Sequence, residues 1–403
     1  MSGVRDQIAE RTDDADPSTT NDTSPNNASP ASPPQTVTYS ASPGLAGWLG
    51  GTRTTVALTS YQSGKFYLIG ANPKGGLMVH ERFYKKAMGV CVPGRLGRDS
   101  DSNGGDGNTL LLATLNQIVR FEDVLEADQR INHLYDACFV PRVSWTTGSV
   151  DLHDVGMGAD GRPLFVVTAY NCIATVSDRH SFRPVWKPSF ISSIVQEDRC
   201  HLNGMAMGEG DEATTPRYAT ACSRSDTIDG WRDRRADGGV VIDVQTNEIV
   251  CSGLSMPHSP RLHDGQLYVL NSGTGELGRV NLDRDPAEAF EPVAFCPGFV
   301  RGLGFGRDAG GASLAIVGLS KPRYERFEGL ALDERLRNAD SEPWCGVQVI
   351  DLATGSVKHW FRIDGAIAEL YDVCAVPNTL CAMAVGHAGP EINTLVTVEK
   401  RGT

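Results

Sequence analysis

Three histidines in this chain lie in short segments that resemble one another, and they have the clearest potential for chemistry. His153, His201 and His258 each stand at or near the start of a segment of small and apolar residues that leads into a β-rich stretch. Neutral imidazole is a good ligand for zinc, iron and copper. If the three segments meet in the fold, the sequence predicts that these histidines bind one divalent metal ion.

The same kind of segment occurs six times, which indicates how the histidines are positioned. The six segments are residues 87–91, 152–156, 201–205, 258–262, 300–304 and 370–374. Strand-rich repeats of roughly 40 to 50 residues are typical of a β-propeller, in which each repeat forms one blade. The innermost strands of the blades surround one axis, so residues far apart in the sequence can meet there. The sequence therefore predicts an all-β fold, a single β-propeller, with the histidines near its axis.

Other polar residues in or beside these segments are candidates for the same site. Asp154 and Asp372 could serve as a catalytic base, or could hold the tautomers of the histidines. A guanidinium group beside aromatic rings suits a carboxylate or phosphate, because its fork pairs with two oxygen atoms at once. The predicted substrate-binding residues are Trp231, Arg261, Arg301, Tyr371 and Asn203. The alternative is structural: histidines that bond to a neighbouring blade, and arginines in surface salt bridges.

The strand pattern predicts six blades in a ring that is closed by N- and C-terminal strands. Residues 54–60, 65–71 and 77–84 form three strand-like runs without an inner partner, and residues 371–376 form an inner run without outer partners. Joining these two incomplete sets closes the ring and pairs strand edges that would otherwise be exposed. A seventh blade within residues 121–147 is the alternative.

Composition separates a tail from the propeller. Residues 1–42 are rich in Asp, Ser, Thr, Asn and Pro with almost no large apolar side chains, so they are predicted to be disordered. The propeller domain is predicted over residues 43–403. Within it, a loop of Gly, Asp and Ser at 95–108 and a charged, helical insertion at 320–343 lengthen two of the repeats.

Charge and hydropathy argue against several kinds of partner. The net charge is −12 and no basic cluster is present, so neither nucleic acid nor an anionic membrane is expected as a partner. The first residues lead into no apolar stretch typical of a secretory signal, and no apolar run approaches about 20 residues. The ten cysteines lack CxxC spacing, so reduced thiols and a cytoplasmic location are expected. A small-molecule substrate is expected, and a protein partner stays open.

Three pairs of motifs resemble those of a known family. They are Gly230-Trp-Arg with Gly238-Gly-Val-Val-Ile-Asp243, Gly253-Leu-Ser-Met-Pro-His-Ser-Pro-Arg261 with Asn271-Ser-Gly-Thr-Gly-Glu276, and Phe299-Val-Arg-Gly-Leu-Gly-Phe305 with Val317-Gly-Leu-Ser-Lys321. The chain resembles a bacterial family of uncharacterised proteins, known only as a domain of unknown function and sometimes joined to tetratricopeptide repeats. The resemblance covers roughly residues 54–378 and implies no particular activity.

Two further runs are similar, more loosely, to repeats of six-bladed sugar lactonases. They are His201-Leu-Asn-Gly-Met-Ala-Met-Gly-Glu-Gly-Asp211 and Asp154-Val-Gly-Met-Gly-Ala-Asp-Gly161. The resemblance implies a divalent cation on the axis, bound by a Glu, two Asn or Asp side chains and a catalytic Asp. It would place Asn203, Asp154 and Asp372 in comparable positions. The histidines depart from that oxygen-only pattern, so zinc, iron or copper is favoured over calcium.

These candidates lead to three functions. The first is a metal-dependent enzyme that hydrolyses a small anionic ester or lactone at the central channel, where the metal polarises the carbonyl group and activates water. Asp154 or Asp372 would be the base, and an arginine would hold the substrate. The second is a non-haem iron or copper oxidoreductase with histidine ligands. The third is a non-catalytic interaction or sensor module, since a propeller fold does not fix function.

Overall fold

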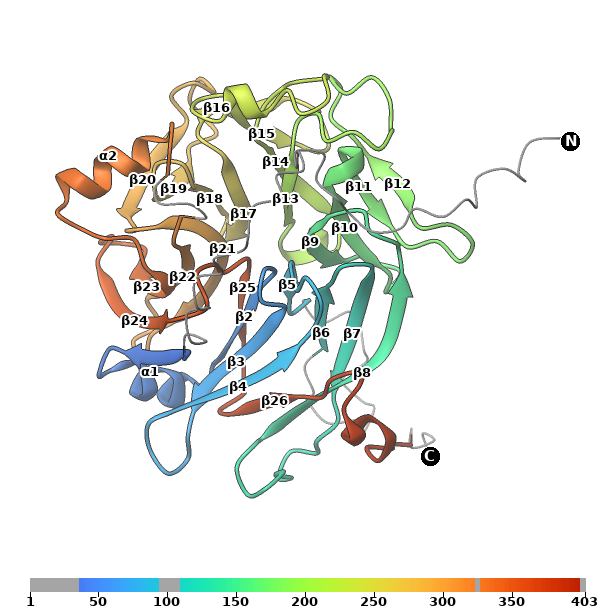
Figure 1. The fold of residues 1–403 in the computed structure, drawn as a ribbon, viewed down its shortest axis with the longest axis vertical. Coiled ribbons are helices and arrows are strands. Elements are labelled where there is room, and N and C mark those ends of the chain that lie inside the picture. Colours follow the sequence, from blue (N-terminus) through green and yellow to red (C-terminus); the bar gives the residue numbers. More distant parts are fainter. Residues whose placement is uncertain (1–35, 94–108, 323–326, 399–403) are drawn as a thin grey trace, which may run out of the picture. The chain divides into compact units, whose positions relative to one another are not determined.

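Six sheets arranged around a common axis make up the described part of the chain (Figure 1). The computed structural model describes residues 36–93, 109–322 and 327–398, all of which belong to one compact unit, Thr36–Thr403. Each sheet begins with one strand at the axis and continues outward through three or four more. The fold is therefore all-β, a six-bladed β-propeller, as the repeats predict.

Four of the sheets have four strands each. From the axis outward, one sheet consists of β25 (Val373–Val376), β2 (Thr55–Ser60), β3 (Lys65–Ala71) and β4 (Leu77–Phe83). The next consists of β9 (Leu152–Met157), β10 (Pro163–Val167), β11 (Cys172–Thr175) and β12 (Arg183–Trp186). Another consists of β13 (Leu202–Met207), β14 (Pro216–Ala221), β15 (Gly239–Asp243) and β16 (Ile249–Leu254). The fourth consists of β17 (Pro257–His263), β18 (Gln266–Asn271), β19 (Glu276–Val280) and β20 (Phe290–Phe295).

The remaining two sheets have five strands each. One consists of β5 (Val90–Cys91), β6 (Thr109–Ala113), β7 (Gln117–Asp123), β8 (Ala137–Thr146) and β26 (Ala382–Ala384). The other consists of β21 (Phe299–Arg307), β22 (Ser313–Ser320), β23 (Cys345–Asp351), β24 (Val357–Asp364) and β1 (Thr38–Ala41). Two α-helices are present in the described residues, α1 (Leu45–Thr52) and α2 (Ala331–Asn338). Short 3-10 helices span Thr168–Tyr170, Gly210–Glu212, Arg232–Arg234 and Pro390–Asn393.

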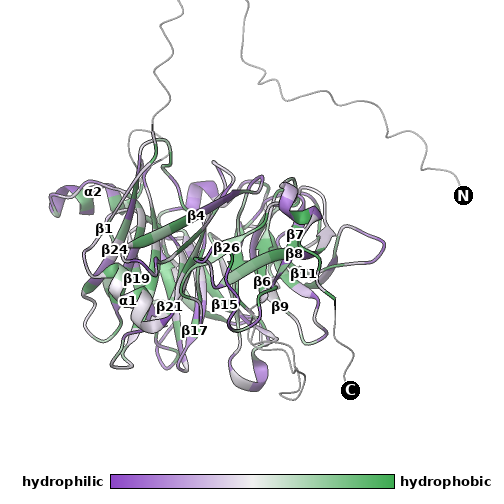
Figure 2. Ribbon diagram, turned by 90° about the horizontal axis from the view of Figure 1, so that it is seen from below, coloured by the Kyte–Doolittle hydropathy of each residue, from purple (hydrophilic) through white to green (hydrophobic). Residues whose placement is uncertain are grey.

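Many of the strands are buried on both faces because each sheet packs between two others. Every residue of β9 and β10 is buried. One hydrophobic cluster joins Leu111 and Ile118 of one sheet to Val155 and Phe165 of the next. Figure 2 shows this pattern: hydrophobic residues lie on the strands, whereas α2 is largely hydrophilic. The core of the propeller therefore lies between the sheets.

The ring is closed where the two ends of the domain meet, as predicted. The inner strand β25 pairs with β2, with Val373 opposite Leu58 and Val376 opposite Thr55. A second closure was not predicted: β26 adds to the outer edge of β8 as a parallel strand, with Ala382 opposite Ala137. The alternative of a seventh blade within residues 121–147 is wrong, because this stretch contributes β8 and the end of β7 to a six-sheet ring.

The end of the predicted tail is a strand of the propeller. Thr38–Ala41 form β1, which pairs with the outer edge of β24. The ring of Tyr39 stacks on that of Phe361 with their centres 5.6 Å apart. Covering an outer strand satisfies backbone groups that would otherwise be exposed, which a composition rich in polar residues does not reveal. The predicted boundary at residue 42 is therefore too late, and residues 1–35 lie outside the described residues.

Two N-terminal deletions separate the tail from β1. Deleting residues 1–42 is expected to lower the melting temperature by about 2 to 4 °C, because the edge of β24 and the Phe361 ring lose their cover. Deleting residues 1–35 keeps β1 and is expected to leave the melting temperature nearly unchanged. Differential scanning calorimetry of both proteins measures the difference. Equal melting temperatures would show that β1 contributes nothing to stability.

The two insertions have different outcomes. The insertion at 320–343 contains the predicted helix, α2, whose Leu332 and Leu336 are buried. The loop at 95–108 lies outside the described residues.

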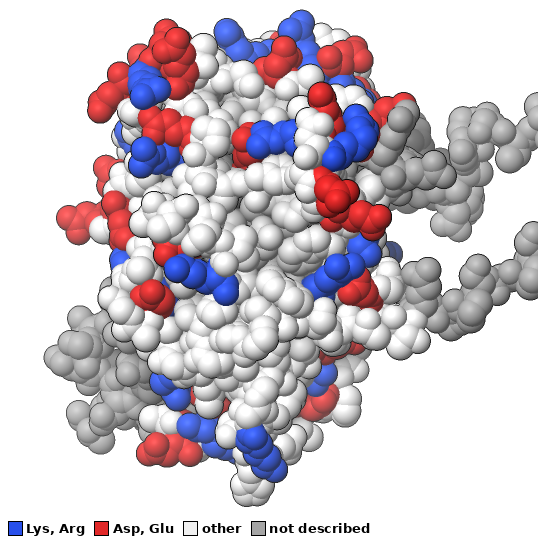
Figure 3. All heavy atoms as spheres, turned by 90° about the vertical axis from the view of Figure 1, so that its left-hand side faces the viewer, with Lys and Arg blue, Asp and Glu red and all other residues white. Residues whose placement is uncertain are grey.

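No helix in the described ranges is long and apolar enough to cross a membrane. On the face of the molecule in Figure 3, acidic and basic side chains are interspersed and form no large patch of one sign.

Glycines allow the inner strands to approach one another closely. A Cβ atom on Gly302 would lie 2.7 Å from the Cα of Asp372, and one on Gly304 would lie 3.1 Å from the Cα of Cys374. Gly302 also has a φ of +76°, in the left-handed region that favours glycine. The two contacts follow the same order along both strands, so β21 and β25 run in the same direction. Their first residues therefore lie at the same end of the axis.

Candidate functional site

Seven side chains from five sheets contact one another at the end of the axis where inner strands begin. This group, called the axial cluster below, consists of His153, His201, Trp231, His258, Phe299, Arg301 and Tyr371. His153 and His258 are the second residues of β9 and β17. His201 directly precedes β13, and Arg301 is the third residue of β21. The structure thus brings together all three predicted metal ligands and three of the five predicted substrate-binding residues.

The first half of the cluster is a series of ring contacts. The rings of Trp231 and His201 are stacked, with their centres 4.2 Å apart. The ring of His201 meets that of His153 edge-on at 5.1 Å. The ring of His153 in turn lies 5.6 Å from the ring of Tyr371. Three blades therefore contribute to one continuous series of ring contacts.

The second half of the cluster is built around an arginine. The guanidinium carbon of Arg301 lies 5.5 Å from the ring centre of Tyr371 and 5.0 Å from that of Phe299. The ring of Phe299 lies 5.7 Å from that of His258. Cation–π contacts of this kind hold a guanidinium group in place without neutralising its charge. Arg301 is therefore oriented by aromatic rings and keeps a full positive charge.

Asp198 holds His201 in an unusual backbone conformation. His201 has a φ of +51°, in the left-handed region that is costly for residues other than glycine. One carboxylate oxygen of Asp198 accepts the His201 backbone N–H at 3.0 Å, and the other lies 2.7 Å from the ring Nδ1. Asp198 thus fixes both the backbone and the ring of His201. Strained residues with such support are concentrated at functional sites.

In the other two histidines, Nε2 is the hydrogen-bond acceptor of the ring. The Nδ1 atom of His153 lies 3.1 Å from the carbonyl oxygen of Asp151, and that of His258 lies 2.8 Å from the carbonyl oxygen of Met256. A carbonyl oxygen only accepts hydrogen bonds, so Nδ1 carries the hydrogen in both rings. Ser272 Oγ also contacts Nδ1 of His258 at 2.9 Å.

Both of these histidines are neutral at pH 7. Burial lowers the pKa of His153 to about 4. Burial also lowers the pKa of His258 well below its usual range, and the nearby charge of Arg301 lowers it further. With Nδ1 protonated and no net charge, Nε2 of each ring carries a lone pair. Such an atom can act as a base or as a metal ligand.

Four buried polar atoms of the cluster have no hydrogen-bond partner among the described residues. They are Trp231 Nε1, His258 Nε2, Arg301 Nε and Tyr371 Oη. Trp186 Nε1, Gln348 Oε1 and His359 Nδ1 are in the same state, but they lie on third or fourth strands of their sheets, away from the axis. Native proteins rarely leave such atoms unpaired, so a concentration of them indicates a place where a polar ligand binds.

Arg261, Asp154 and Asp372 form a separate ion network across the axis. The guanidinium group of Arg261 binds both carboxylate oxygens of Asp154, at 2.7 and 3.2 Å, and lies 3.5 Å from an oxygen of Asp372. It also donates to the carbonyl oxygen of Met205 at 3.0 Å. Each carboxylate also accepts backbone N–H groups, from Met205 for Asp154 and from Val90 for Asp372. These three residues, predicted as substrate anchor and catalytic bases, therefore bond to one another and to backbone groups of neighbouring blades.

The buried carboxyl group of Asp372 predicts a particular pH dependence of stability. Burial raises the pKa of Asp372 to about 7, although Arg261 acts in the opposite direction. Because an unfolded Asp has a pKa of about 3.9, this group stabilises the fold below pH 4 and loses that contribution as the pH rises towards 7. Compared with wild type, the Asp372→Asn variant is expected to lose less stability over this interval. Urea unfolding of both proteins at several pH values measures the free energy of unfolding.

A surface carboxylate is the control for that measurement. Asp178, whose side chain is 82% exposed, pairs with Arg162 at the rim of a blade. The Asp178→Asn variant should keep the pH dependence of the wild type. If Asp372→Asn also keeps it, the Asp372 carboxyl group is ionised in the folded protein throughout this range.

Asn203 lies inside its own sheet rather than in the axial cluster. Its side-chain oxygen accepts a hydrogen bond from Thr220 Oγ1 at 2.8 Å, and its nitrogen lies 3.4 Å from the sulfur of Cys222. Both partners belong to or directly follow β14, the strand that pairs with β13. The amide group of Asn203 is therefore used within the blade, and its predicted contact with a substrate stays a prediction.

The fit of a metal ion to the three histidines is incomplete. All three Nδ1 atoms are fixed by oxygen atoms, as is usual for metal-bound histidines. However, no three His, Cys, Asp or Glu side chains in the described residues are grouped so that they could hold one ion. Arg301 also places a positive charge in the same cluster. The divalent metal therefore stays a prediction.

Several residues of the site were missed by the sequence analysis. Asp198 and Ser272 hold the rings of His201 and His258, and Phe299 orients Arg301. Phe299 and Arg301 belong to one motif, of which the sequence predicts only the arginine as a site residue. The spacing of Asp198 three residues before His201 is a signal that could have been used.

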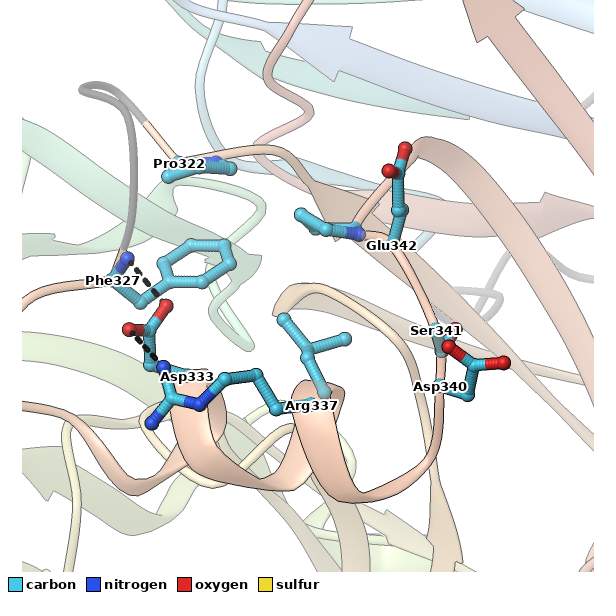
Figure 4. A pocket seen from close by; sticks show the side chains of 9 residues that line it. Pro322, Phe327, Asp333, Arg337, Asp340, Ser341 and Glu342 are labelled. Atoms are coloured by element: carbon cyan, nitrogen blue, oxygen red, sulfur yellow. Dashed lines mark hydrogen bonds and ion pairs between the residues drawn. The ribbon is translucent and has the colours of Figure 1, made fainter.

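A pocket of about 380 Å³ lies beside α2 (Figure 4). Its apolar wall is made by Pro322, Phe327, Leu336 and Pro343. The ring of Phe327 lies 6.2 Å from that of Phe299, so the pocket adjoins the axial cluster. Within it, Asp333 is paired with Arg337 at 3.1 Å. No unpaired group like those of the axial cluster is found on the described lining residues, so the pocket is not part of the candidate site.

The fold and the axial cluster define a β-propeller with a polar site at one end of its axis. The chain belongs to the family described as a domain of unknown function (DUF4915), which matches residues 43–385. The family resemblance seen in the sequence is thereby confirmed. No curated protein sequence matches the chain.

Solved structures with a similar fold are distant in sequence. The structure of a nidogen/laminin complex shares 10% identity and covers 81% of this chain and 99% of its own, with a TM-score of 0.44. Virginiamycin B lyase from Staphylococcus aureus shares 10% identity over 81% of this chain and 99% of its own, with a TM-score of 0.35. An aldose sugar dehydrogenase from Streptomyces coelicolor shares 13% identity over 77% of this chain and 91% of its own, with a TM-score of 0.37. None of these similarities carries an argument about function.

Proposed function

We propose that this protein is an enzyme that hydrolyses a small anionic ester or lactone at the axial cluster. The observation that carries the proposal is the set of four buried polar atoms that have no hydrogen-bond partner in the described part of the chain and lie beside neutral histidines. Such a set offers donors for developing negative charge and a base for water in one place. The proposal needs only side chains of the protein, and it keeps Arg301 as the anchor of the anionic group.

The roles of the residues follow from their hydrogen bonding. Nε2 of His258 takes a proton from water as the oxygen of that water bonds to the carbonyl carbon. The N–H of Trp231 and the hydroxyl group of Tyr371 stabilise the oxyanion that forms. When the ester C–O bond breaks, the leaving oxygen receives the proton that Nε2 of His258 took from water, so the ring of His258 is neutral again at the end of the reaction.

The test is hydrolysis of a panel of small esters and lactones that carry a carboxylate or phosphate. The His258→Gln variant is expected to lower kcat by about 10²-fold or more, because a general base contributes that much. His263→Gln is a matched control: His263 lies on the same strand, at its other end, and stacks on Phe305 at 4.2 Å. An equal loss in both variants, or no hydrolysis of any compound, would contradict the proposal.

A metal-dependent form of this chemistry is the second candidate, favoured by the fixed Nδ1 atoms of all three histidines. In that case the Nε2 atoms would be the ligands, and the metal would supply Lewis-acid activation of water. Elemental analysis of protein purified without chelator distinguishes the two. Near-stoichiometric zinc, iron or copper that is lost in His258→Gln would favour the metal-dependent form; iron or copper that changes its spectrum with oxygen would favour an oxidoreductase.

A further inference from the structure

The four atoms of the axial cluster that have no partner among the residues described by the structure differ in what they require from a ligand. Trp231 Nε1 and Arg301 Nε can only donate a hydrogen bond, and Tyr371 Oη can donate one. His258 Nε2 can only accept one, because its Nδ1 hydrogen points to the carbonyl oxygen of Met256. A ligand that satisfies all four must offer acceptor oxygens to three atoms and a donor, such as a hydroxyl group, to the fourth.

The charge of the cluster narrows the class of ligand. Arg261 is neutralised by Asp154 and Asp372. Arg301, by contrast, forms no ion pair with any carboxylate of the described residues, and its Nε atom is buried. One uncompensated positive charge matches a monoanion better than the two negative charges of a phosphate monoester. The planar guanidinium fork also matches a carboxylate.

The positions of Arg301 and His258 bring the two ligand groups close together. Both side chains contact the ring of Phe299, with the guanidinium carbon at 5.0 Å and the His258 ring at 5.7 Å from its centre. The charge of Arg301 also lowers the pKa of His258, a residue that is only 3% exposed. A carboxylate on Arg301 and a hydroxyl group on His258 are therefore within reach of one small molecule.

We infer that the axial cluster binds a small hydroxycarboxylate, with its carboxylate on Arg301 and its hydroxyl group donating to Nε2 of His258. In this complex, where no ester carbonyl group is present, Trp231 and Tyr371 complete the contacts to the carboxylate oxygens. The inference rests on the proposed function in that it names the alcohol part of the anionic ester or lactone, whose carboxylate Arg301 holds and whose hydroxyl group is released by hydrolysis. The free hydroxycarboxylate is a product of that reaction, so it can be used as a probe without any turnover.

The experiment compares five small probes by NMR, with the indole N–H signal of Trp231 as the reporter. The probes are glycolate, acetate, glycolamide, acetamide and inorganic phosphate, which vary the charge and the hydroxyl group independently. The signal is assigned among the six tryptophans with the Trp231→Phe variant. Glycolate is expected to bind about tenfold more tightly than acetate and than glycolamide, since each lacks one of the two required groups.

Variants locate the two groups. In His258→Phe, the preference for glycolate over acetate should disappear. In Tyr371→Phe, the binding of glycolate and the binding of acetate should weaken by the same factor. Tyr371→Phe removes only an unpartnered hydroxyl group, so it is expected to fold even if His258→Phe does not. Arg307→Gln is the control, because Arg307 lies at the other end of β21 and pairs with Asp264.

The outcomes separate this inference from the proposed reaction. Equal binding of acetate, phosphate and glycolate would overturn the hydroxycarboxylate class, and so would the absence of any shift of the Trp231 signal. A glycolate preference that survives in His258→Phe would overturn the assignment of the hydroxyl group. Hydrolysis of anionic esters without a glycolate preference would leave the proposed reaction standing, whereas a glycolate preference without hydrolysis would leave the binding site standing.

Discussion

Replacing Arg301 with methionine is expected to weaken binding of the anionic substrate by about a hundredfold or more without destabilising the fold. Losing the charged partner of a desolvated anion costs at least about 2 to 3 kcal/mol of binding free energy. The fold, however, loses only stacking contacts with Phe299 and Tyr371 and is relieved of a cation that no carboxylate of the described residues pairs with. KM for hydrolysis and the melting temperature are the two measurements.

The combination of these results identifies a functional arginine. A structural arginine would show the reverse, with a clear fall in melting temperature. Arg301→Lys is an informative companion, since it keeps the charge but not the fork and should recover binding only in part. If Arg301→Met lowers the melting temperature strongly and leaves KM unchanged, Arg301 is a packing residue and the substrate anchor lies elsewhere.

Replacing Arg261 with methionine is expected to have the opposite effect, a loss of about 3 to 5 kcal/mol in the free energy of unfolding. The substitution leaves the carboxylates of Asp154 and Asp372 buried without their shared cation, and such an uncompensated charge is strongly destabilising. The loss should be smaller at acidic pH, because burial raises the pKa of Asp372 and protonation of that carboxyl group removes the repulsion. Urea unfolding at pH 7 and pH 5 measures both effects.

A compensating variant controls for simple loss of packing. Combining Arg261→Met with Asp154→Asn removes the charge that the arginine neutralises, so part of the stability should return. If the double variant is no more stable than Arg261→Met alone, the ion network contributes little and the loss arises from the missing side-chain volume.

The architecture could be predicted from the sequence because each repeat corresponds to one blade. Six segments of one kind fix the number of inner strands, and a ring of sheets then brings their first residues to one end of the axis. The meeting of His153, His201 and His258 follows from this geometry alone. The repeats do not predict an irregular addition such as β1. This strand of four residues pairs with the outer edge of β24, which lies far away in the sequence.

The roles of individual polar residues were harder to predict, for a physical reason. Arg261 and Arg301 occupy similar segments, yet one faces two carboxylates across the axis and the other faces aromatic rings. Which carboxylate meets which arginine depends on the rotation of each blade about the axis, and a single sequence does not contain that information. Asn203 shows the same limit, because its partner Thr220 comes from the neighbouring strand.

Ring closure also has a consequence for how the chain folds as it is synthesised. Thr55, at the start of β2, donates to the carbonyl oxygen of Thr379, 324 positions later in the sequence. A nascent chain on the ribosome therefore exposes the unpaired edge of β2 until nearly the whole propeller has emerged. Contacts of such long range slow folding and leave aggregation-prone edges open in the meantime. The sheet that contains β2 is thus completed only near the end of translation, and translation that stops before Tyr371 would leave the axial cluster without this ring.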